Sequence, residues 1–271
     1  MSSEQQVLLF EVMGSIAQIT FSRPEALNAL NEDMACAFRD AIARVAGDDS
    51  LRVLVLRGAG RGFMAGGDIA TMARDPLRNA PLLLDPLHEA LLKMAELPIP
   101  VLAGLHGPVA GAGMSVALAA DLALAADNTI FQMAYTRIGA SPDGSGTWHL
   151  ARLVGLRKAL EIALLSDAVD AARALDLGLV NWVVPAAEFD GRLGAMAKRL
   201  AEGATGAYGR SKALLRTASL RSLAEQLDAE RAAFMQGAAG PEFREGAQAF
   251  LEKRKPDFLA AASAGQRNTL T

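Results

Sequence analysis

The chain has 271 residues, of which 51% are hydrophobic and 21% are charged, and its formal net charge at pH 7 is −3. This length allows one large domain with a substantial core, or one domain with a helical appendage. The slightly acidic balance argues against nucleic acid or an anionic membrane as a partner. The single cysteine, Cys36, excludes an internal disulfide framework, and with three histidines the chain offers few ligands for a metal site.

Two features of the sequence bear on where the protein works. The segment before Val12 has no basic stretch that leads into an apolar core, so we expect no signal peptide. The longest apolar run, Met114–Ala120, is far shorter than the roughly 20 residues of a membrane span. We therefore expect a cytoplasmic protein without membrane contact.

The first part of the chain predicts a hairpin, a helix and a buried strand. Val7–Val12 and Ile16–Phe21 flank a short turn, as the two strands of a hairpin do. Asn31 is a suitable cap for an amphipathic helix that ends at Gly47. Val53–Leu56 is continuously apolar, which is typical of a strand covered on both faces in an α/β protein.

A glycine-rich stretch follows this strand. Gly58–Asp68 has five glycines in eleven residues, a density that lets a ligand approach the main chain. Asp68 is expected to cap a short helix over Ile69–Ala73. The three prolines of Asp75–Pro86 predict a mobile loop, and Pro86–Glu96 has the apolar spacing of a helix.

The central stretch, His106–Ala125, follows a predicted strand at Val101–Leu105 and enters an apolar helix through several glycines. The first N–H groups of such a helix have no partner and can hold a developing negative charge. We therefore expect half of an oxyanion hole in this stretch. Short strands are predicted at Leu122–Ala125 and Ile130–Met133, and a polar loop at Gly139–Gly146.

The last third of the chain is predicted to be mostly helical, with one strand at Val180–Val184. Strands and crossovers thus occupy the first two thirds, which indicates an α/β fold. The expected late helices are Arg157–Leu165, Ala171–Leu175, Phe189–Glu202, Tyr208–Thr217, Leu220–Met235 and Glu242–Glu252.

Two glycine-rich turns and one acidic loop are the candidates for chemistry. Neither turn has the order and spacing of a nucleotide-binding loop. One backbone N–H from each could instead converge on a single oxygen, as stabilisation of an enolate requires, although glycine turns more often serve as tight structural connections. Asp143, in the loop SPDGSG, is a general base or nucleophile, or only a turn former or helix cap. His106 and His149 are expected to make structural hydrogen bonds.

Four blocks of sequence together resemble the crotonase (enoyl-CoA hydratase/isomerase) superfamily. They are RPEALNALN at Arg23–Asn31, GRGFMAGGDI at Gly60–Ile69, PVLAGLHGPVAGAGMSVALAADLALAAD at Pro100–Asp127, and FREGAQAFLEKRKPDF at Phe243–Phe258. The resemblance implies a ββα spiral core over residues 1–200, a C-terminal helical trimerisation region over 201–271, and a homotrimer or dimer of trimers. It also implies acyl-CoA thioesters as substrates, and no cofactor beyond the coenzyme A of the substrate.

The resemblance also implies roles for single residues. The backbone N–H groups of Gly67 and Ala112 would hold the thioester oxygen, and Asp143 would be the catalytic carboxylate. Ser115 and Tyr135 occupy the positions of the two hydratase glutamates, so the carboxylates that hydration needs are missing there. No metal site is implied. The residues expected to contact substrate are Arg23, as a CoA phosphate contact, Ala26, Leu27, Ala65, Asp68, Ile69, His88, Gly111, Ser115 and Tyr135.

The block SPDGSGTW, together with MAYTRIG and the REGAQAFLEKR tail, resembles the epoxyphenylacetyl-CoA isomerases of this superfamily. We therefore expect an isomerase in which Asp143 moves a proton from the α to the γ carbon of a 3-enoyl thioester, or converts an epoxyphenylacetyl thioester to an oxepin thioester. One alternative is a 4-chlorobenzoyl-CoA-type dehalogenase, in which Asp143 attacks the ring and His88 activates water. An enoyl-CoA hydratase and a non-catalytic acyl-CoA-binding protein are the others.

Overall fold

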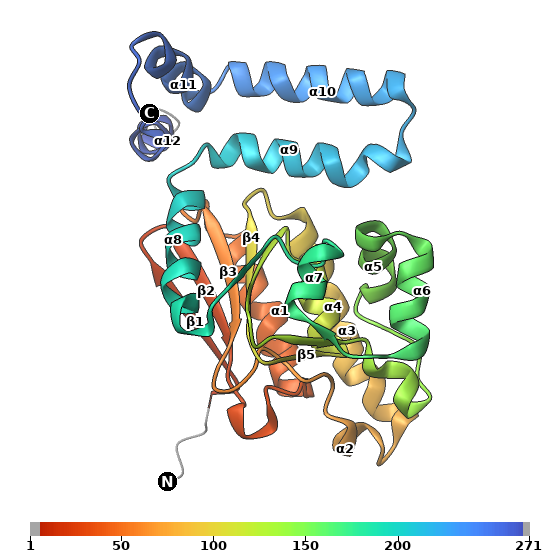
Figure 1. Cartoon of the computed structure of the whole chain (residues 1–271). Helices are drawn as coiled ribbons and strands as arrows, with labels where there is room; N and C mark the ends of the chain where they lie inside the picture. The colour runs from red at the N-terminus through yellow and green to blue at the C-terminus, as the bar shows by residue number, and fades with distance from the viewer. Residues whose placement is uncertain (1–5, 268–271) are drawn as a thin grey trace.

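The computed structural model describes residues 6–267, in which nine strands form two sheets (Figure 1). The larger sheet has the order β1-β2-β3-β4-β6-β9 and the smaller has the order β5-β7-β8. Neighbours in the larger sheet are parallel except in the β1–β2 hairpin. The strands are β1 (Leu8–Met13), β2 (Ile16–Phe21), β3 (Val53–Gly58), β4 (Val101–Leu105), β5 (Pro108–Ala110), β6 (Leu122–Ala126), β7 (Ile130–Gln132), β8 (Val169–Asp170) and β9 (Trp182–Val184).

Helices connect and cover these strands. None of them, within residues 6–267, is both long and apolar enough to cross a membrane. The α-helices are α1 (Glu32–Ala46), α2 (Ile69–Met72), α3 (Pro76–Glu96), α4 (Ala112–Ala119), α5 (Gly146–Val154), α6 (Leu156–Leu165), α7 (Ala171–Asp176), α8 (Phe189–Ala201), α9 (Thr205–Thr217), α10 (Leu223–Ala238), α11 (Pro241–Leu251) and α12 (Phe258–Arg267). Short 3-10 helices cover Pro24–Ala26, Ala134–Ile138, Ala186–Glu188 and Ala218–Leu220.

From β4 to β7, consecutive strands alternate between the two sheets, and a helix follows each pair. β4 in the larger sheet leads to β5 in the smaller sheet and then to α4, and β6 leads to β7 and then to α5. The segment after β3 follows the same order, with a one-residue bridge in place of the second strand. Met64 forms this parallel bridge with Val109 of β5, and α2 and α3 follow. This repetition is the expected ββα spiral, and it places the segments after β3 and β4 next to each other.

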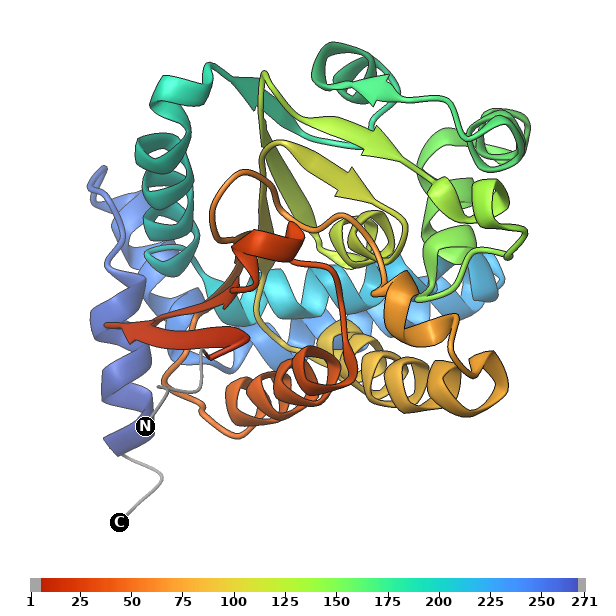
Figure 2. The ribbon, with the colours of Figure 1, turned by 90° about the horizontal axis from the view of Figure 1, so that it is seen from below.

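Helices cover both faces of the larger sheet, which explains why its inner strands are continuously apolar. On one face, Phe189 and Leu193 of α8 pack with Val55 and Leu102 of the sheet. On the other face lie α1, α3 and α4, with α1 and α3 side by side (Figure 2). The expected cap of α1 is confirmed, because the Asn31 side chain accepts a hydrogen bond from the N–H of the third helical residue at 3.1 Å.

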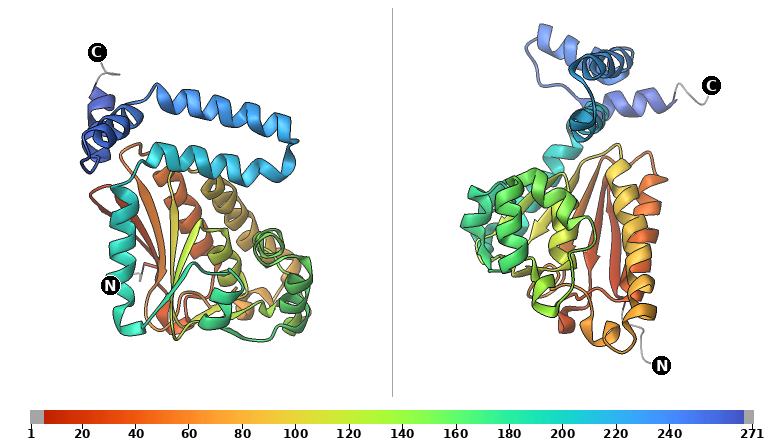
Figure 3. Two further views of the ribbon diagram at one scale, coloured as in Figure 1. Left: turned by 45° about the horizontal axis from the view of Figure 1, so that its top comes forward. Right: turned by 90° about the vertical axis from the view of Figure 1, so that its right-hand side faces the viewer.

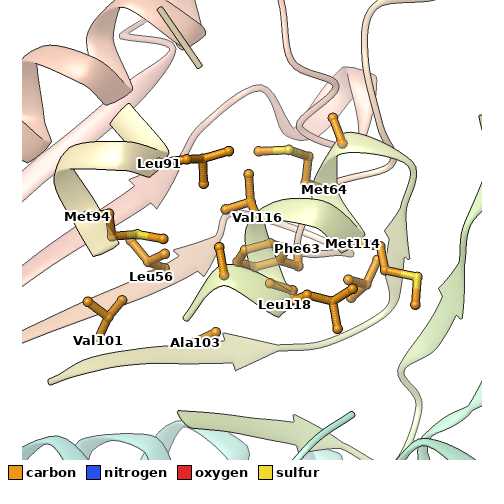
Figure 4. Packing of buried hydrophobic residues seen from close by; sticks show 14 of the residues in the cluster. Leu56, Phe63, Met64, Leu91, Met94, Val101, Ala103, Met114, Val116 and Leu118 are labelled. Carbon is orange, nitrogen blue, oxygen red and sulfur yellow. The ribbon is translucent and has the colours of Figure 1, made fainter. Parts of the chain in front are cut away.

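Helix α4 is enclosed by the core, and every one of its residues is buried. Figure 4 shows Met114 and Leu118 of this helix in the same cluster as Leu56 and Phe63. The Phe63 ring also meets the ring of Phe21 edge-on, with 5.6 Å between the centroids, a geometry that aromatic pairs favour. The glycine-rich turn after β3 is therefore anchored to the core by its own aromatic side chain.

The mobile loop expected over Asp75–Pro86 is wrong, because this segment is the first half of α3. Asp75 caps the helix by accepting from the N–H of Arg78 at 3.4 Å, and Pro76 lies in the first turn, where a missing N–H breaks no helical bond. Each of the two internal prolines removes one helical hydrogen bond. The helix persists because it buries a row of leucines against the core. They are Leu83, Leu87 and Leu91.

Helices α9 to α12 lie outside the two sheets (Figure 3). Asp121, shortly after α4, holds α9 to the core through ion pairs of 2.8 Å with Lys212 and of 2.8 Å with Arg216. It also accepts a hydrogen bond from the N–H of Val101 at 2.8 Å. The division expected after residue 200 falls one residue before the end of α8, and a trimerisation role for the later helices stays a prediction.

Replacing Asp121 with alanine removes the charged partner of the Lys212 ammonium group, whose side chain is only 9% exposed, and leaves it the carbonyl of Ile99. Removing one member of a buried ion pair typically costs roughly 3–5 kcal/mol, so we expect the free energy of unfolding in urea to fall by about 3 kcal/mol. Asp40→Ala, which removes an exposed pair with Arg39, is the control and should cause no measurable loss. Equal stability of the two variants would contradict a stabilising role for Asp121.

Candidate active site

Two glycine-rich turns are bonded to each other beyond the ends of β3 and β4. Met64 of the first turn donates its N–H to the carbonyl of Pro108 at 3.2 Å, and Ala110 donates its N–H to the carbonyl of Met64 at 2.9 Å. Gly113 permits this approach, because a Cβ atom at that position would overlap the backbone of Met64. Main-chain bonds therefore fix the relative position of the two turns.

The N–H groups of Gly67 and Ala112 have no acceptor within residues 6–267. Leu30 donates its N–H to the carbonyl of Gly66 and accepts from the N–H of Asp68. The Gly67 amide lies between these two bonds and takes part in neither. Ala112 is the first residue of α4 and follows Gly111, whose φ is +49°. A Cβ atom on Gly111 would lie 3.3 Å from the Cα of Gly66, so the two turns touch beside these amides. Unpaired N–H groups at a helix start favour a negative charge.

Two side chains from different elements, and one main-chain N–H, bond to Asp143. Tyr135, in the 3-10 helix Ala134–Ile138, donates its hydroxyl to Oδ1 of Asp143 at 2.6 Å. Ser115, on α4, donates its hydroxyl to the main-chain carbonyl of Asp143 at 2.9 Å and lies 3.2 Å from the Tyr135 oxygen. Gly146 donates its N–H to the same carbonyl at 3.0 Å. Both the side chain and the main chain of Asp143 are thus held in place.

Burial has the largest effect on the pKa of the Asp143 carboxyl. It raises the pKa of the half-buried Asp143 carboxyl, while the hydrogen bond from Tyr135 and the charge of His88 act in the opposite direction. Burial also raises the pKa of the Tyr135 phenol, and the neighbouring Asp143 charge adds to this rise. The phenol therefore keeps its proton and acts as the donor.

The loop that carries Asp143 lies close against α3 and α4. Gly144 has a φ of +55°, and a Cβ atom there would lie 3.2 Å from the Cβ of Ser115 and 3.3 Å from Leu87. Ser145, which follows, also has a left-handed backbone, with a φ of +66°. Its hydroxyl is buried and has no hydrogen-bond partner in the described part of the chain. Ser115 thus fills a confined space in which a longer side chain would displace the loop.

The expected substrate residues near the start of the chain form one bonded unit with the first glycine-rich turn. Arg23 pairs with Asp68 at 3.2 Å and donates to the carbonyl of Ala29 at 2.6 Å. Ala65 donates its N–H to the carbonyl of Leu27 at 3.0 Å. The expected helix cap is confirmed, since Asp68 accepts from the third helical N–H at 3.3 Å. Ala26 ends the 3-10 helix of this loop and Ile69 begins α2 with its side chain exposed.

Asn28 organises this unit and was not singled out from the sequence. It is fully buried with a φ of +58°. Its amide nitrogen donates to the carbonyls of Ala59, Gly62 and Phe63 at 2.9, 2.8 and 3.1 Å. Its amide oxygen accepts from the N–H of Arg23 at 2.8 Å. An asparagine before an alanine gives no local signal of this role, because all these partners lie elsewhere in the chain or depend on the fold of the loop.

The three histidines differ in their surroundings. His88, on α3, is exposed, and its charge acts on Asp143. His106 makes the expected structural bond, with 3.0 Å between its Nε2 and the carbonyl of Gly60. His149 does not, since the described residues offer its ring no hydrogen bond; burial, with the charges of nearby arginines, lowers its pKa to about 4. No group of three or more His, Cys, Asp or Glu side chains between residues 6 and 267 is placed to hold a metal ion.

Residues 11–261 match the family model described as enoyl-CoA hydratase/isomerase. A protein of Rhodobacter capsulatus named "Probable enoyl-CoA hydratase" is 39% identical over 92% of this chain and 96% of its own length. The 1,2-epoxyphenylacetyl-CoA isomerase of Escherichia coli is 35% identical over 93% of this chain and 98% of its own length. The crystal structure of an enoyl-CoA hydratase from Polaromonas sp. JS666 has a TM-score of 0.87 and 34% identity, and the match covers 92% of this chain and 98% of that one.

The fold, the paired glycine turns and these matches define an enzyme of the crotonase class. The chain belongs to the enoyl-CoA hydratase/isomerase family.

Replacing Asn28 with alanine should destabilise the unit around Arg23 and the first glycine turn. The change leaves buried carbonyl groups without donors, and each such group costs roughly 1–3 kcal/mol. We expect the free energy of unfolding to fall by about 3 kcal/mol, measured by urea denaturation. Asn79→Ala removes an exposed amide that donates to the carbonyl of Thr71 at 2.9 Å and should leave stability nearly unchanged. A loss no larger than that of Asn79→Ala would show that Asn28 does not organise this loop.

Proposed function

We propose that this enzyme is an acyl-CoA isomerase that moves a proton between two carbons of a thioester by means of Asp143. The observation that carries the proposal is the hydrogen bonding of the two oxygens of this carboxylate. One oxygen accepts from Tyr135 at 2.6 Å, and the other has no hydrogen-bond partner within residues 6–267. A carboxylate with one free oxygen can accept a proton from carbon. The name of the Escherichia coli relative, 1,2-epoxyphenylacetyl-CoA isomerase, supports the same class of reaction.

In the proposed reaction the thioester oxygen accepts hydrogen bonds from the N–H groups of Gly67 and Ala112. Asp143 removes a proton from the α carbon, and the electron pair of that C–H bond moves into an enolate whose charge rests on the thioester oxygen. The protonated Asp143 then gives the proton to the γ carbon, and the double bond moves from the 3- to the 2-position. Loss of one oxyanion donor typically costs roughly 2.7–4 kcal/mol of transition-state stabilisation.

One base is enough for this transfer, because the proton that leaves the α carbon is the one that returns. The proposal therefore needs no cofactor beyond the coenzyme A of the substrate. For an epoxyphenylacetyl thioester, the proposed outcome is ring expansion to an oxepin thioester.

The unit around Arg23 is proposed to border the coenzyme A part of the substrate. Its guanidinium group already bonds to Asp68 and to the carbonyl of Ala29, so a phosphate contact would use its remaining donors. The neighbouring groups proposed to line the same path are Ala26, Leu27, Ala65, Asp68, Ile69 and Gly111.

A hydratase is the less favoured function, because Ser115 and Tyr135 stand where the resemblance places the two hydratase glutamates. Neither side chain is a carboxylate that can activate water. A binding protein without turnover is disfavoured by the same Asp143 geometry that supports an isomerase. Tight CoA binding with no conversion of any thioester would favour this last alternative.

A dehalogenase is a second candidate, and one observation favours it. His88 is near enough for its charge to act on the carboxyl of Asp143, and in its neutral form an imidazole there could serve as a base. In that reaction Asp143 would displace chloride from the ring, and His88 would activate water to hydrolyse the aryl ester. Release of chloride from 4-chlorobenzoyl-CoA distinguishes this chemistry from isomerisation.

We also propose that copies of this chain form a trimer or a dimer of trimers. Helix α10 has no buried residue within a single chain, and its Leu223 and Phe234 are 76% and 63% exposed. The α6 helix likewise exposes Leu156 and Leu164. Large exposed apolar patches of this kind favour contact with another chain.

Replacing Asp143 tests the isomerase proposal. We expect Asp143→Asn and Asp143→Ala to lose roughly 100-fold or more of the turnover of 3-enoyl-CoA, because the general base is removed. In the unchanged enzyme, kcat/KM should fall as the pH drops through the pKa of Asp143, which burial raises above the ordinary aspartate value. Asp143 acts in its deprotonated form, so acid inactivates it.

The measurement is an assay of 3-enoyl, 2-enoyl, epoxyphenylacetyl and 4-chlorobenzoyl thioesters with each variant. The proposal is wrong if a folded Asp143→Ala enzyme keeps most of its turnover of 3-enoyl-CoA. It is also wrong if the unchanged enzyme converts only the 2-enoyl substrate, to a hydroxyacyl product.

Sedimentation equilibrium tests the proposed assembly. We expect the unchanged protein to have three or six times the mass of one chain, and the double variant Leu223→Glu, Phe234→Glu to dissociate, because it places charges on the exposed apolar face of α10. Leu77→Glu changes a leucine that is 92% exposed on α3 and is the matched control. A monomeric unchanged protein would contradict the assembly.

A further inference from the structure

We propose that Tyr135 is a positioning residue that gives the two oxygens of Asp143 different tasks. The phenol holds Oδ1 at 2.6 Å, and Oδ2 is the atom that takes the proton from the substrate and returns it. This inference rests on the proposed role of Asp143 as the base. It adds a function to Tyr135 beyond lining the site.

The direction of the hydrogen bond between Tyr135 and Asp143 follows from which of the two groups carries a proton. An ionised carboxylate has no proton and can only accept, so the phenol of Tyr135 must donate to it. A separation of 2.6 Å is typical of a hydroxyl that donates to a charged oxygen. The single proton of Ser115 has two acceptors in reach, the carbonyl of Asp143 at 2.9 Å and the oxygen of Tyr135 at 3.2 Å. With either choice, the proton of Tyr135 remains directed at Asp143.

Asp143 lies in a loop outside the helices and strands, so the orientation of its carboxylate depends on partners from neighbouring elements. The segment Gly139–Gly146 contains three glycines, which lose more conformational freedom on folding than other residues. Ser115 fixes the main chain of Asp143 through its carbonyl, and Tyr135 fixes the orientation of the carboxylate plane. The two donors come from α4 and from the 3-10 helix Ala134–Ile138, so the core itself orients the base.

Tyr135 also opposes the effect of burial on the base. Burial favours the neutral acid, whereas the phenol stabilises the carboxylate. When Oδ2 takes a proton, the bond from Tyr135 loses its charged acceptor and weakens. The bond regains its strength when the proton passes to the γ carbon. The phenol therefore favours the return of the proton as well as the presence of the free base.

The substitution Tyr135→Phe tests this role, and the chain offers a matched control. It has two tyrosines, and the second, Tyr208, lies on α9. In Tyr135→Phe we expect the acid limb of the kcat/KM profile to move up by about one pH unit. We expect kcat at neutral pH to fall about tenfold, with KM little changed. Tyr208→Phe should match the unchanged enzyme in all three quantities.

A merely structural role for Tyr135 would lower kcat or thermal stability without moving the acid limb, and that result would overturn the inference. A variant with 3-fluorotyrosine at position 135, in the Tyr208→Phe background, keeps the size of the side chain and covers the case in which Tyr135→Phe does not fold. The fluorinated phenol is a stronger donor, so the acid limb should move to lower pH. A shift in the same direction as that of Tyr135→Phe, or none, would contradict the inference.

A titration that needs no turnover separates this inference from the proposed function. The ¹³C carboxyl resonance of Asp143, assigned by its loss in Asp143→Asn, should titrate about one pH unit higher in Tyr135→Phe than in Tyr208→Phe. If Asp143→Ala keeps its turnover, the proposed function fails, and this titration still decides whether Tyr135 holds the carboxylate. If Asp143→Asn abolishes turnover while neither the resonance nor the acid limb moves in Tyr135→Phe, the inference alone is wrong.

Discussion

The site depends on one main-chain contact, the pairing of Met64 with β5. Two hydrogen bonds close this contact, and they bring the turn after β3 against the start of α4. The contact requires the absence of a side chain at Gly113. Because α4 is buried along its whole length, it cannot shift to relieve a misfit in the turn. The amides of Gly67 and Ala112 and the side chain of Ser115 therefore share one rigid frame.

Three polar side chains, those of Ser115, Tyr135 and Asp143, lie beside this apolar core and are linked by hydrogen bonds. Ser115 bonds to the backbone of the Asp143 loop, and Tyr135 bonds to the carboxylate. Burial makes an unpaired polar group costly, so the arrangement is strongly determined by the groups around it. The same burial raises the pKa of the Asp143 carboxyl, while the hydrogen bond from the phenol lowers it.

The sequence predicted those elements that depend on residues close together in the chain. Asn31 and Asp68 cap the helices that follow them, and the continuous apolar run Val53–Leu56 forms a strand with both faces covered, as expected. The strands β5 and β8 were not predicted, since three and two residues are too few to show an alternation. The prolines predicted a loop at Asp75–Pro86, but this segment is helical because α3 buries leucines against the core. The partners of Asn28 and Tyr135 come from segments that only the complete fold brings together.

Helix α3 is unevenly stabilised along its length. Its two internal prolines leave two carbonyl groups of the first half without helical donors, while the second half places Leu87 and Leu91 against the Asp143 loop. Local opening costs least where backbone bonds are missing and side chains are solvated, and Leu77 in the first half is 92% exposed. The first half of α3 is therefore held less firmly than the second half, in which Leu87 and Leu91 are packed beside the Asp143 loop.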